Sequence, residues 1–184
     1  MIIYDIMEDP HAIMTPSDTS DSSFHPLSDK WTLWAHLPHD TNWNLDSYID
    51  IDTFDTLEHA IALNETIPEK MLKNCMLFLM KSGIKPTWED PSNRMGGCFS
   101  YKVSNKNVTE VWKKMYYLLI GKSVSKDKSF ISAINGITIS PKKNFCIVKL
   151  WMSNCNKQNP DLIDTNKIKH LNTSCLFKKH LPEF

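Results

Sequence analysis

Hydrophobic and polar positions alternate most regularly over residues 48–54, where the order is Tyr-Ile-Asp-Ile-Asp-Thr-Phe. Alternation with a period of two predicts a β-strand that buries one face. Other segments are rich in aromatic and β-branched residues, or form short apolar runs of strand length. They predict five further strands, at residues 30–37, 75–80, 98–103, 130–139 and 145–152.

Apolar residues at helical spacing occur in fewer segments. Those from Val108 to Leu119 predict an amphipathic helix over residues 108–120, which Gly121 would end. A second helix is predicted over residues 56–67, with Asp55 as its N-cap and Glu58 in a capping-box position. A weaker helical pattern covers residues 161–178.

Strands that follow one another as hairpins, with three interspersed helices, indicate an α+β domain. In such a domain the helices cover one face of an antiparallel sheet. A length of 184 residues suits a single domain. Residues 1–24 are acidic and rich in Ser, Thr, Asp and Pro, so we expect a disordered acidic tail followed by one domain over residues 25–184.

Charge and cysteine usage narrow the class of protein. The 21 Lys and Arg balance the 21 Asp and Glu, which argues against binding to long nucleic-acid backbone but not against binding one nucleotide. No apolar run reaches the roughly 20 residues of a membrane span, and no basic residue precedes Lys30, so neither a membrane segment nor a leader is expected. The five scattered cysteines favour reduced thiols in a cytoplasmic protein.

Catalytic and metal-binding patterns are missing from the sequence. His36 and His39 have no Cys or carboxylate partners at ligand spacing, so we interpret them as surface histidines in a loop. No Gly-rich phosphate loop or nucleophile motif is present. The sequence therefore predicts a protein that is not an enzyme and uses neither a metal nor a cofactor.

Three tryptophans, Trp43, Trp88 and Trp151, stand out together with Glu89. Trp88 lies in a polar, Pro-flanked loop, whereas Trp31, Trp34 and Trp112 are expected in the core. Two indole faces could hold a flat cation, at about 2 kcal/mol once water is excluded. A carboxylate accepting hydrogen bonds from the ring's edge would add about 1.5–3 kcal/mol. The cationic base N7-methylguanine needs both, although packing remains the alternative for Trp151.

The chain also resembles a known family in several strings that stand in the same order. They are His25-Pro26-Leu27, Trp43, Phe54-Asp55-Thr56-Leu57-Glu58, Gly83-Ile84-Lys85-Pro86-Thr87-Trp88-Glu89-Asp90, Asn93, Gly96-Gly97, and Trp151 with Cys155. On these residues, which span about 24–155, the chain resembles the eukaryotic translation initiation factor 4E family, the mRNA cap-binding proteins.

The resemblance implies a strongly curved antiparallel sheet, backed by three helices on its convex face, with a slot for the cap on the concave side. Trp43 and Trp88 would sandwich the methylated base. Glu89 would accept from its N1–H and amine, and Trp151 would contact the N7-methyl group. Basic residues before the third tryptophan would hold the cap phosphates, which here points to Lys142, Lys143 and Lys149, with solvated surface lysine as the alternative. Cys98 replaces the basic residue that the family usually has after Gly-Gly.

The resemblance further implies a partner surface on the other side of the domain. It would consist of His25, Pro26, Leu57, Ile61 and Gly121. In the family this surface takes a helical Tyr-x-x-x-x-Leu-apolar motif from a scaffold, initiation factor 4G, or from a repressor. Ile61 stands where a Trp is usual, so a divergent partner is expected.

Three functions follow as hypotheses. The first is a protein that binds the 7-methylguanosine cap and recruits capped mRNA to translation initiation through a scaffold. The second keeps the cap pocket but acts as a repressor, because its altered partner surface cannot hold the scaffold. The third, from another class, is an aromatic-platform carbohydrate-binding module, which would not distinguish methylated from unmethylated guanine nucleotides.

Overall fold

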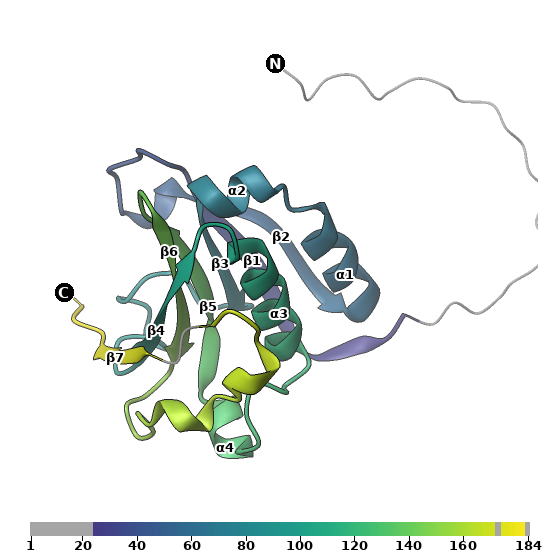
Figure 1. Ribbon diagram of the computed structural model, residues 1–184, viewed down its shortest axis with the longest axis vertical. Coiled ribbons are helices and arrows are strands. Elements are labelled where there is room, and N and C mark those ends of the chain that lie inside the picture. Colours follow the sequence, from purple (N-terminus) through teal and green to yellow (C-terminus); the bar gives the residue numbers. More distant parts are fainter. Residues whose placement is uncertain (1–23, 172–173, 183–184) are drawn as a thin grey trace, which may run out of the picture.

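The computed structural model describes residues 24–171 and 174–182. Seven strands form one curved antiparallel sheet in the order β2-β1-β3-β5-β6-β4-β7 (Figure 1). Their bounds are β1 Pro26–His36, β2 Tyr48–Thr56, β3 Met76–Lys81, β4 Gly97–Ser104, β5 Ile134–Pro141, β6 Phe145–Met152 and β7 Cys175–Lys179. The predicted α+β fold with a curved antiparallel sheet is confirmed.

The larger helices lie together over one side of this sheet (Figure 1). They are α1 Leu57–Thr66, α2 Glu69–Asn74 and α3 Val108–Ile120, while the short α4, Lys128–Ser132, lies at one end. Three short 3₁₀ turns complete the described structure: η1 Leu45–Ser47, η2 Pro160–Leu162 and η3 Thr165–Lys167. Within the described residues, no helix has the length and apolar character needed to cross a membrane.

The period of two along each strand divides the sheet into two faces. One face packs against the helices in the main core, which contains Leu33, Leu79 and Leu150 of the sheet and Trp112 of α3, all fully buried. Each buried leucine contributes roughly 1.5–3 kcal/mol. The opposite face carries a smaller cluster, whose buried members are Phe78, Met80, Cys98 and Trp151. The helix-free face is therefore partly apolar and has room for a ligand.

The predicted core tryptophans divide between these faces. Trp31 and Trp112 are buried in the main core as predicted. Trp34 is only half-buried and packs against the smaller cluster on the helix-free face. Its place follows from strand alternation, because Trp34 lies between Leu33 and Ala35, which both face the helices.

The start of α1 differs from the predicted capping box. Thr56, not Asp55, is the N-cap, and its side chain accepts a hydrogen bond from the His59 N–H at 3.4 Å. Glu58 instead accepts from the backbone N–H of His25 at 3.0 Å. Strand pairing explains the shift: Pro26 of β1 pairs with Thr56, which keeps Asp55 and Thr56 in β2.

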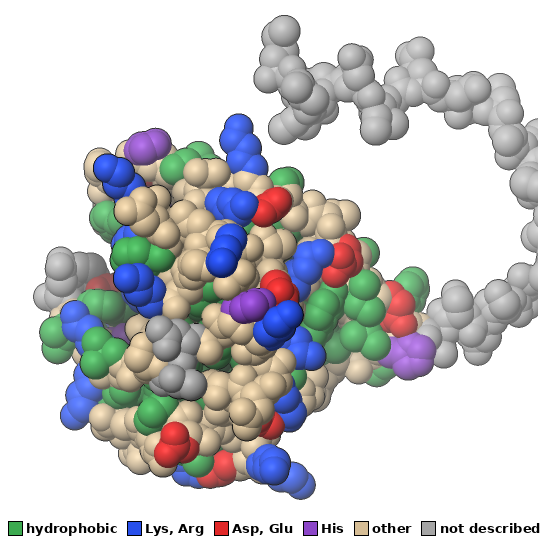
Figure 2. Space-filling view, viewed as in Figure 1, with side chains coloured by type: hydrophobic (Ala, Val, Ile, Leu, Met, Phe, Trp, Pro, Cys, Tyr) green, Lys and Arg blue, Asp and Glu red, His purple; other side chains and the backbone are tan. Residues whose placement is uncertain are grey.

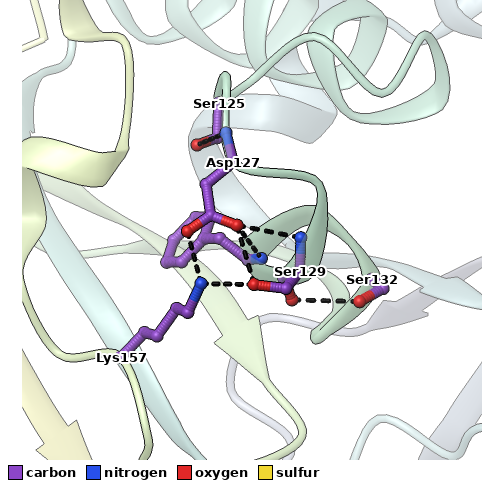
Figure 3. Close-up of polar contacts among 6 residues, drawn as sticks. Ser125, Asp127, Ser129, Ser132 and Lys157 are labelled. Carbon is purple, nitrogen blue, oxygen red and sulfur yellow. Dashed lines mark hydrogen bonds and ion pairs between the residues drawn. The ribbon is translucent and has the colours of Figure 1, made fainter.

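The predicted strand at residues 130–139 begins only at Ile134, because its first residues belong to α4. Figure 3 shows the reason. Asp127 caps α4 by accepting from the N–H groups of Ser129 at 2.9 Å and Phe130 at 3.1 Å, and it also pairs with Lys157. An N-cap aspartate with an ion partner stabilises even a one-turn helix, and strand composition does not reveal it.

The helix predicted over residues 161–178 is wrong. The described part of this segment contains η2, η3 and then β7, which pairs antiparallel with β4. Close packing fits the strand: a Cβ on Gly97 of β4 would lie 2.6 Å from the Phe177 ring. Tertiary pairing outweighs a weak local helix preference here, and β7 brings His180 to the helix-free face.

The expected disordered tail at residues 1–24 lies outside the described residues except for Phe24, so it stays a prediction. The predicted domain over residues 25–184 likewise stays a prediction.

Candidate functional site

A cavity of about 510 Å³ opens on the helix-free face of the sheet. All four residues predicted to bind a base line it: Trp43, Trp88, Glu89 and Trp151. Two of the three predicted lysines, Lys142 and Lys149, line it as well, whereas Lys143 does not. The remaining lining comes from loop and strand residues: Asn44, Tyr48, Met76, Phe78, Pro86, Thr87 and Ser140.

Trp43 lies in the loop between β1 and β2 and is 56% exposed. One face of its indole stacks on His36, with ring centroids 4.3 Å apart and planes 1° from parallel. His36 is 2% exposed, and its Nε2 hydrogen bonds to the Asn42 carbonyl oxygen at 2.8 Å. The interpretation of His36 as a surface loop residue is therefore wrong: it ends β1 and supports the indole from behind.

Trp88 is supported in the same way by a second histidine. His180 stacks on it at 5.4 Å between centroids, 15° from parallel, and is itself only 5% exposed. His180 Nδ1 lies 2.7 Å from the Asn93 carbonyl oxygen, which can only accept, so Nδ1 carries the proton. Nε2 then accepts from the Cys98 thiol at 2.9 Å. Burial lowers the pKa of His180, so this ring is neutral at pH 7.

Cys98 contributes no charge to the cavity. Its side chain is buried beneath Trp88, and burial raises the pKa of the thiol to about 12. The thiol is hydrogen-bonded to His180, and the prediction that this position offers no basic phosphate contact stays a prediction.

The loop that carries Trp88 is fixed by buried amides. The Asn93 side chain donates to the carbonyl oxygens of Lys85 at 2.9 Å and Thr87 at 2.8 Å. Its own oxygen accepts from Asn135 at 2.9 Å. Asn135 is the extra residue of a bulge in β5, which gives it a position outside the regular pairing with β6. Asp90 closes the loop by accepting from the Lys85 N–H at 2.8 Å.

Glu89 is half-buried, follows Trp88 in the sequence and lines the cavity together with Tyr48. The pKa of Tyr48 is raised to about 12, mainly by burial and further by the Glu89 charge. Tyr48 packs edge-on against His36 at 5.1 Å and against Phe78 at 5.4 Å. A carboxylate in this partly apolar setting is a strong acceptor for hydrogen bonds from a ligand.

Trp151 forms the floor of the cavity. It is 3% exposed, and its Nε1–H donates to the Thr138 hydroxyl at 2.6 Å. Phe78 and His180 pack at angles to it, at centroid distances of 6.4 and 4.9 Å. The floor is thus rigid and apolar, with its polar atom already satisfied.

Cations gather at one side of the cavity. Lys149 is half-buried, and its pKa is lowered mainly by burial and also by the neighbouring charges of Lys142 and Lys178. Lys178 lies over the Trp88 ring at 6.0 Å. Among the ion pairs of the described residues, none includes any of these three lysines. Cations that repel one another beside a cavity favour an anionic ligand.

On the helix side, four of the predicted partner residues lie close together. The Leu57 N–H donates to the His25 carbonyl oxygen at 2.8 Å, which joins α1 to His25 and Pro26. Leu57 and Ile61, one helical turn apart, are 38% and 42% exposed. Gly121 follows α3 and is exposed. Figure 2 shows hydrophobic side chains gathered over the region of α1 and the start of β1.

His180, Asn135 and Tyr48 are functional candidates that the sequence did not reveal. His180 follows a segment with a helical pattern, and Asn135 depends on a bulge that no local pattern announces. The alternation over residues 48–54 does place Tyr48 on one strand face, and its position next to the Trp43 loop is a usable signal.

The cavity therefore combines three chemical features. Two indole faces are each backed by a histidine, one carboxylate lies beside them, and lysines lie at one side. Such a site suits a flat cationic ring with hydrogen-bond donors on one edge and an anionic extension.

Comparisons with known proteins agree with this geometry. The family model described as "Eukaryotic initiation factor 4E" matches residues 26–181. Eukaryotic translation initiation factor 4E of Eremothecium gossypii is 32% identical over 152 residues, which cover 78% of this chain and 69% of that protein. The protein of the same name from Saccharomyces cerevisiae is 28% identical over 156 residues, or 81% and 71% of the two chains.

Solved structures share the fold. A complex of C. elegans eIF4E-3 with the 4E-binding protein Mextli and cap analog has a TM-score of 0.75 at 23% identity, covering 86% of this chain and 94% of that one. Schistosome eIF4E complexed with m7GpppG and 4E-BP has a TM-score of 0.74 at 23% identity, covering 85% and 88%. Because the family model matches most of this chain, the chain belongs to the eukaryotic initiation factor 4E family.

Proposed function

We propose that this chain binds the 7-methylguanosine cap of mRNA in the cavity on the helix-free face, and that it recruits capped mRNA to translation initiation in the cytoplasm. One observation carries the proposal: Trp43, which is far from Trp88 and Glu89 in the sequence, lines a single cavity with these two residues and with Lys142 and Lys149. The relatives solved with cap compounds support it.

Electrostatics explain why the methylated base would be preferred. Methylation at N7 gives the purine a positive charge, and the indole faces of Trp43 and Trp88 attract cations by about 2 kcal/mol or more when water is excluded. Trp151 would meet the methyl group at the apolar floor. Neutral guanine would stack in the same place without the charge-dependent part of this energy.

Glu89 would select guanine over other bases. Guanine presents two donors on one edge, N1–H and the exocyclic amine, and a carboxylate accepts both. Adenine would place its N1, a hydrogen-bond acceptor, against the Glu89 carboxylate, which is also an acceptor. Both groups would then lack a donor, which costs about 1–3 kcal/mol. Lys142 and Lys149 would hold the phosphates, and Lys143, outside the cavity, is the weakest candidate of the three.

The partner surface is proposed to consist of His25, Pro26, Leu57, Ile61 and Gly121. Its exposed apolar side chains fit a helical Tyr-x-x-x-x-Leu-apolar motif, and two solved relatives are held with 4E-binding proteins. A scaffold similar to initiation factor 4G would make the chain an initiation factor.

A repressor is the second candidate. Glu65 of α1 accepts hydrogen bonds from Lys113 and from the Tyr117 hydroxyl of α3, so part of the helix surface is committed to internal contacts. A pull-down of the scaffold from a lysate of the source organism separates the two functions. Capture of the scaffold supports recruitment, and retention of cap-bound RNA without the scaffold supports repression.

The cap proposal is tested by titrating tryptophan fluorescence with 7-methyl-GTP and with GTP. Tighter binding of 7-methyl-GTP, with quenching from the stacked indoles, is the expected result. Equal affinity for the two nucleotides contradicts the proposal and agrees with an aromatic carbohydrate-binding platform. A matched titration with cellohexaose then identifies that alternative.

A further inference from the structure

A second surface continues from the cavity across three strands of the same sheet face. Cross-strand pairs place Ser100 of β4 beside Lys149 of β6 and, on its other side, beside Leu176 of β7. Directly opposed residues in an antiparallel sheet share a face. Because Lys149 lines the cavity, Ser100 and Leu176 belong to the cavity face.

The same register extends this surface in both directions. Towards the cavity, Cys98 pairs with Lys178. Away from it, Lys102 pairs with Ile147. Residues two apart on a strand are separated by about 7 Å, so the surface from Cys98 to Lys102 is about 14 Å long. We name it the strand track, with Lys178, Ser100, Leu176, Lys102 and Phe145 as its residues.

No described helix packs on the strand track. Intervening residues of the same strands, such as Phe99 and Tyr101, are buried against the helices on the other face. Leu176, by contrast, is 67% exposed. Within the part of the chain that the structure describes, the track is therefore an uncovered sheet face that begins where the cavity ends.

The charge of the strand track is uniformly positive. Strands β4, β6 and β7 contain no Asp or Glu. Lys102, like Lys178, takes part in no ion pair among the described residues. β2 at the opposite edge carries three Asp residues, so the basic character is local and is hidden by the zero net charge of the whole chain.

An aromatic ring accompanies these lysines. The Lys102 ammonium lies over the Phe145 ring, 4.4 Å from its centroid. Phe145 and Leu176 are both accessible to solvent. Surfaces that bind single-stranded nucleic acid combine cations for the phosphates with aromatic rings for the bases.

We propose that the strand track holds the first nucleotides that follow the cap, so that the chain binds capped RNA more tightly than the cap alone. The inference rests on the proposed cap function, because the cap fixes where the RNA begins. Phosphates would pass from Lys178 and Lys149 to Lys102, and one base would lie on Phe145. A strand advances at least about 3.4 Å per nucleotide, so the track serves only a few nucleotides.

The test compares 7-methyl-GTP with a capped RNA of about five nucleotides over a range of salt concentrations. The wild-type protein should bind the capped RNA more tightly and with a steeper salt dependence. Each lysine–phosphate contact adds about 0.7 to the slope of log K against log salt for a single strand.

Lys102→Ala is the decisive variant, because Lys102 does not line the cavity. It should lower the affinity for capped RNA by about two- to fivefold and lower the salt slope by about 0.7. The affinity for 7-methyl-GTP should stay unchanged. Phe145→Leu should lower the affinity for capped RNA without changing the salt slope of binding. The matched control Lys114→Ala removes an exposed lysine of α3 on the other side of the sheet and should behave as wild type.

Each other outcome overturns a definite part of the account. Tight binding of 7-methyl-GTP with no gain from the attached nucleotides overturns the strand track alone. Equal effects of Lys102→Ala and Lys114→Ala do the same. Competition by polyglutamate as strong as by RNA identifies an acidic-peptide surface instead. Failure of the wild-type protein to bind 7-methyl-GTP overturns the cap function, and the track with it.

Discussion

The two loops that carry Trp43 and Trp88 face the same cavity but are built differently. Residues 37–46 are all exposed, and hydrogen bonds such as that from the Asn42 N–H to Asp40 lie at the surface. The loop of Trp88 depends on Asn93, which is fully buried, and on His180.

This difference separates two tasks within one site. Buried, fully satisfied amides hold a loop in one geometry, whereas exposed hydrogen bonds compete with water and open more easily. We therefore expect the Trp88 side to be ordered before the proposed ligand binds. In the proposed function the Trp43 side would complete the sandwich around the base, and the stacking of Trp43 on His36 limits the orientations of the indole.

The largest effect is expected from breaking the buried loop. Asn93→Ala removes the side-chain donor to the Lys85 and Thr87 carbonyl oxygens and one of the two hydrogen bonds of the Asn135 amide, which keeps its bond to Ser92. The change should lower the unfolding free energy by about 2–4 kcal/mol. The matched change Asn42→Ala in the exposed loop should cost only about 0.5 kcal/mol. Urea denaturation measures both, and equal costs would contradict the proposed difference between the loops.

Glu89→Gln tests the fixed side without altering its shape. One acceptor charge is lost, so affinity for 7-methyl-GTP should fall about ten- to a hundredfold, corresponding to about 1.5–3 kcal/mol. Calorimetric titration gives the affinity, and the melting temperature should stay near that of the wild type. Glu69→Gln on α2 is the control. Unchanged affinity of the Glu89 variant would remove the carboxylate from base recognition.

Trp43→Ala should affect binding more than folding. Losing one stacked face costs about 1–2 kcal/mol of binding, or roughly five- to thirtyfold in affinity. The unfolding free energy should change by less than about 1 kcal/mol, because the side chain is 56% exposed. A large loss of stability with intact binding would show that Trp43 serves packing instead.

The smallest expected effect is a loss of stability of the folded protein at acidic pH. Burial lowers the pKa of His180, and nearby Lys149 adds to the shift, while Glu89 and the Asn93 carbonyl oppose it. The folded state therefore binds fewer protons than the unfolded state near this group. Its stabilising contribution is complete above about pH 6.5, the unfolded value, and decreases as the pH falls below it.

His180→Asn should flatten this acid dependence of the unfolding free energy between pH 7.5 and 5. His39→Asn, which changes an exposed histidine in the other loop, should keep the wild-type slope. Identical slopes for the two variants would mean that His180 does not titrate as its burial implies.

Much of this architecture was predictable from the sequence. Alternation located β2, and helical spacing gave α3 its exact range, Val108–Ile120, because both elements bury one regular face. The resemblance brought Trp43, Trp88, Glu89 and Trp151 together, and all four line one cavity.

What the sequence missed depends on contacts between distant segments. β7 forms because it pairs with β4, and α4 forms because Asp127 caps it while Lys157 pairs with that carboxylate. His36 and His180 become supports only when strand ends place them behind an indole. Such supporting roles can be predicted only when the pairing of the strands is known, and the pattern of residues along one segment does not reveal that pairing.

Hydrogen exchange of the free protein, with 7-methyl-GTP and with GTP, tests the central claim most directly. The account predicts that residues 85–95 are protected before any ligand is added, while residues 38–47 gain protection on binding 7-methyl-GTP and much less with GTP at the same concentration. Equal protection by the two nucleotides, or no change at residues 38–47 with either, would contradict it.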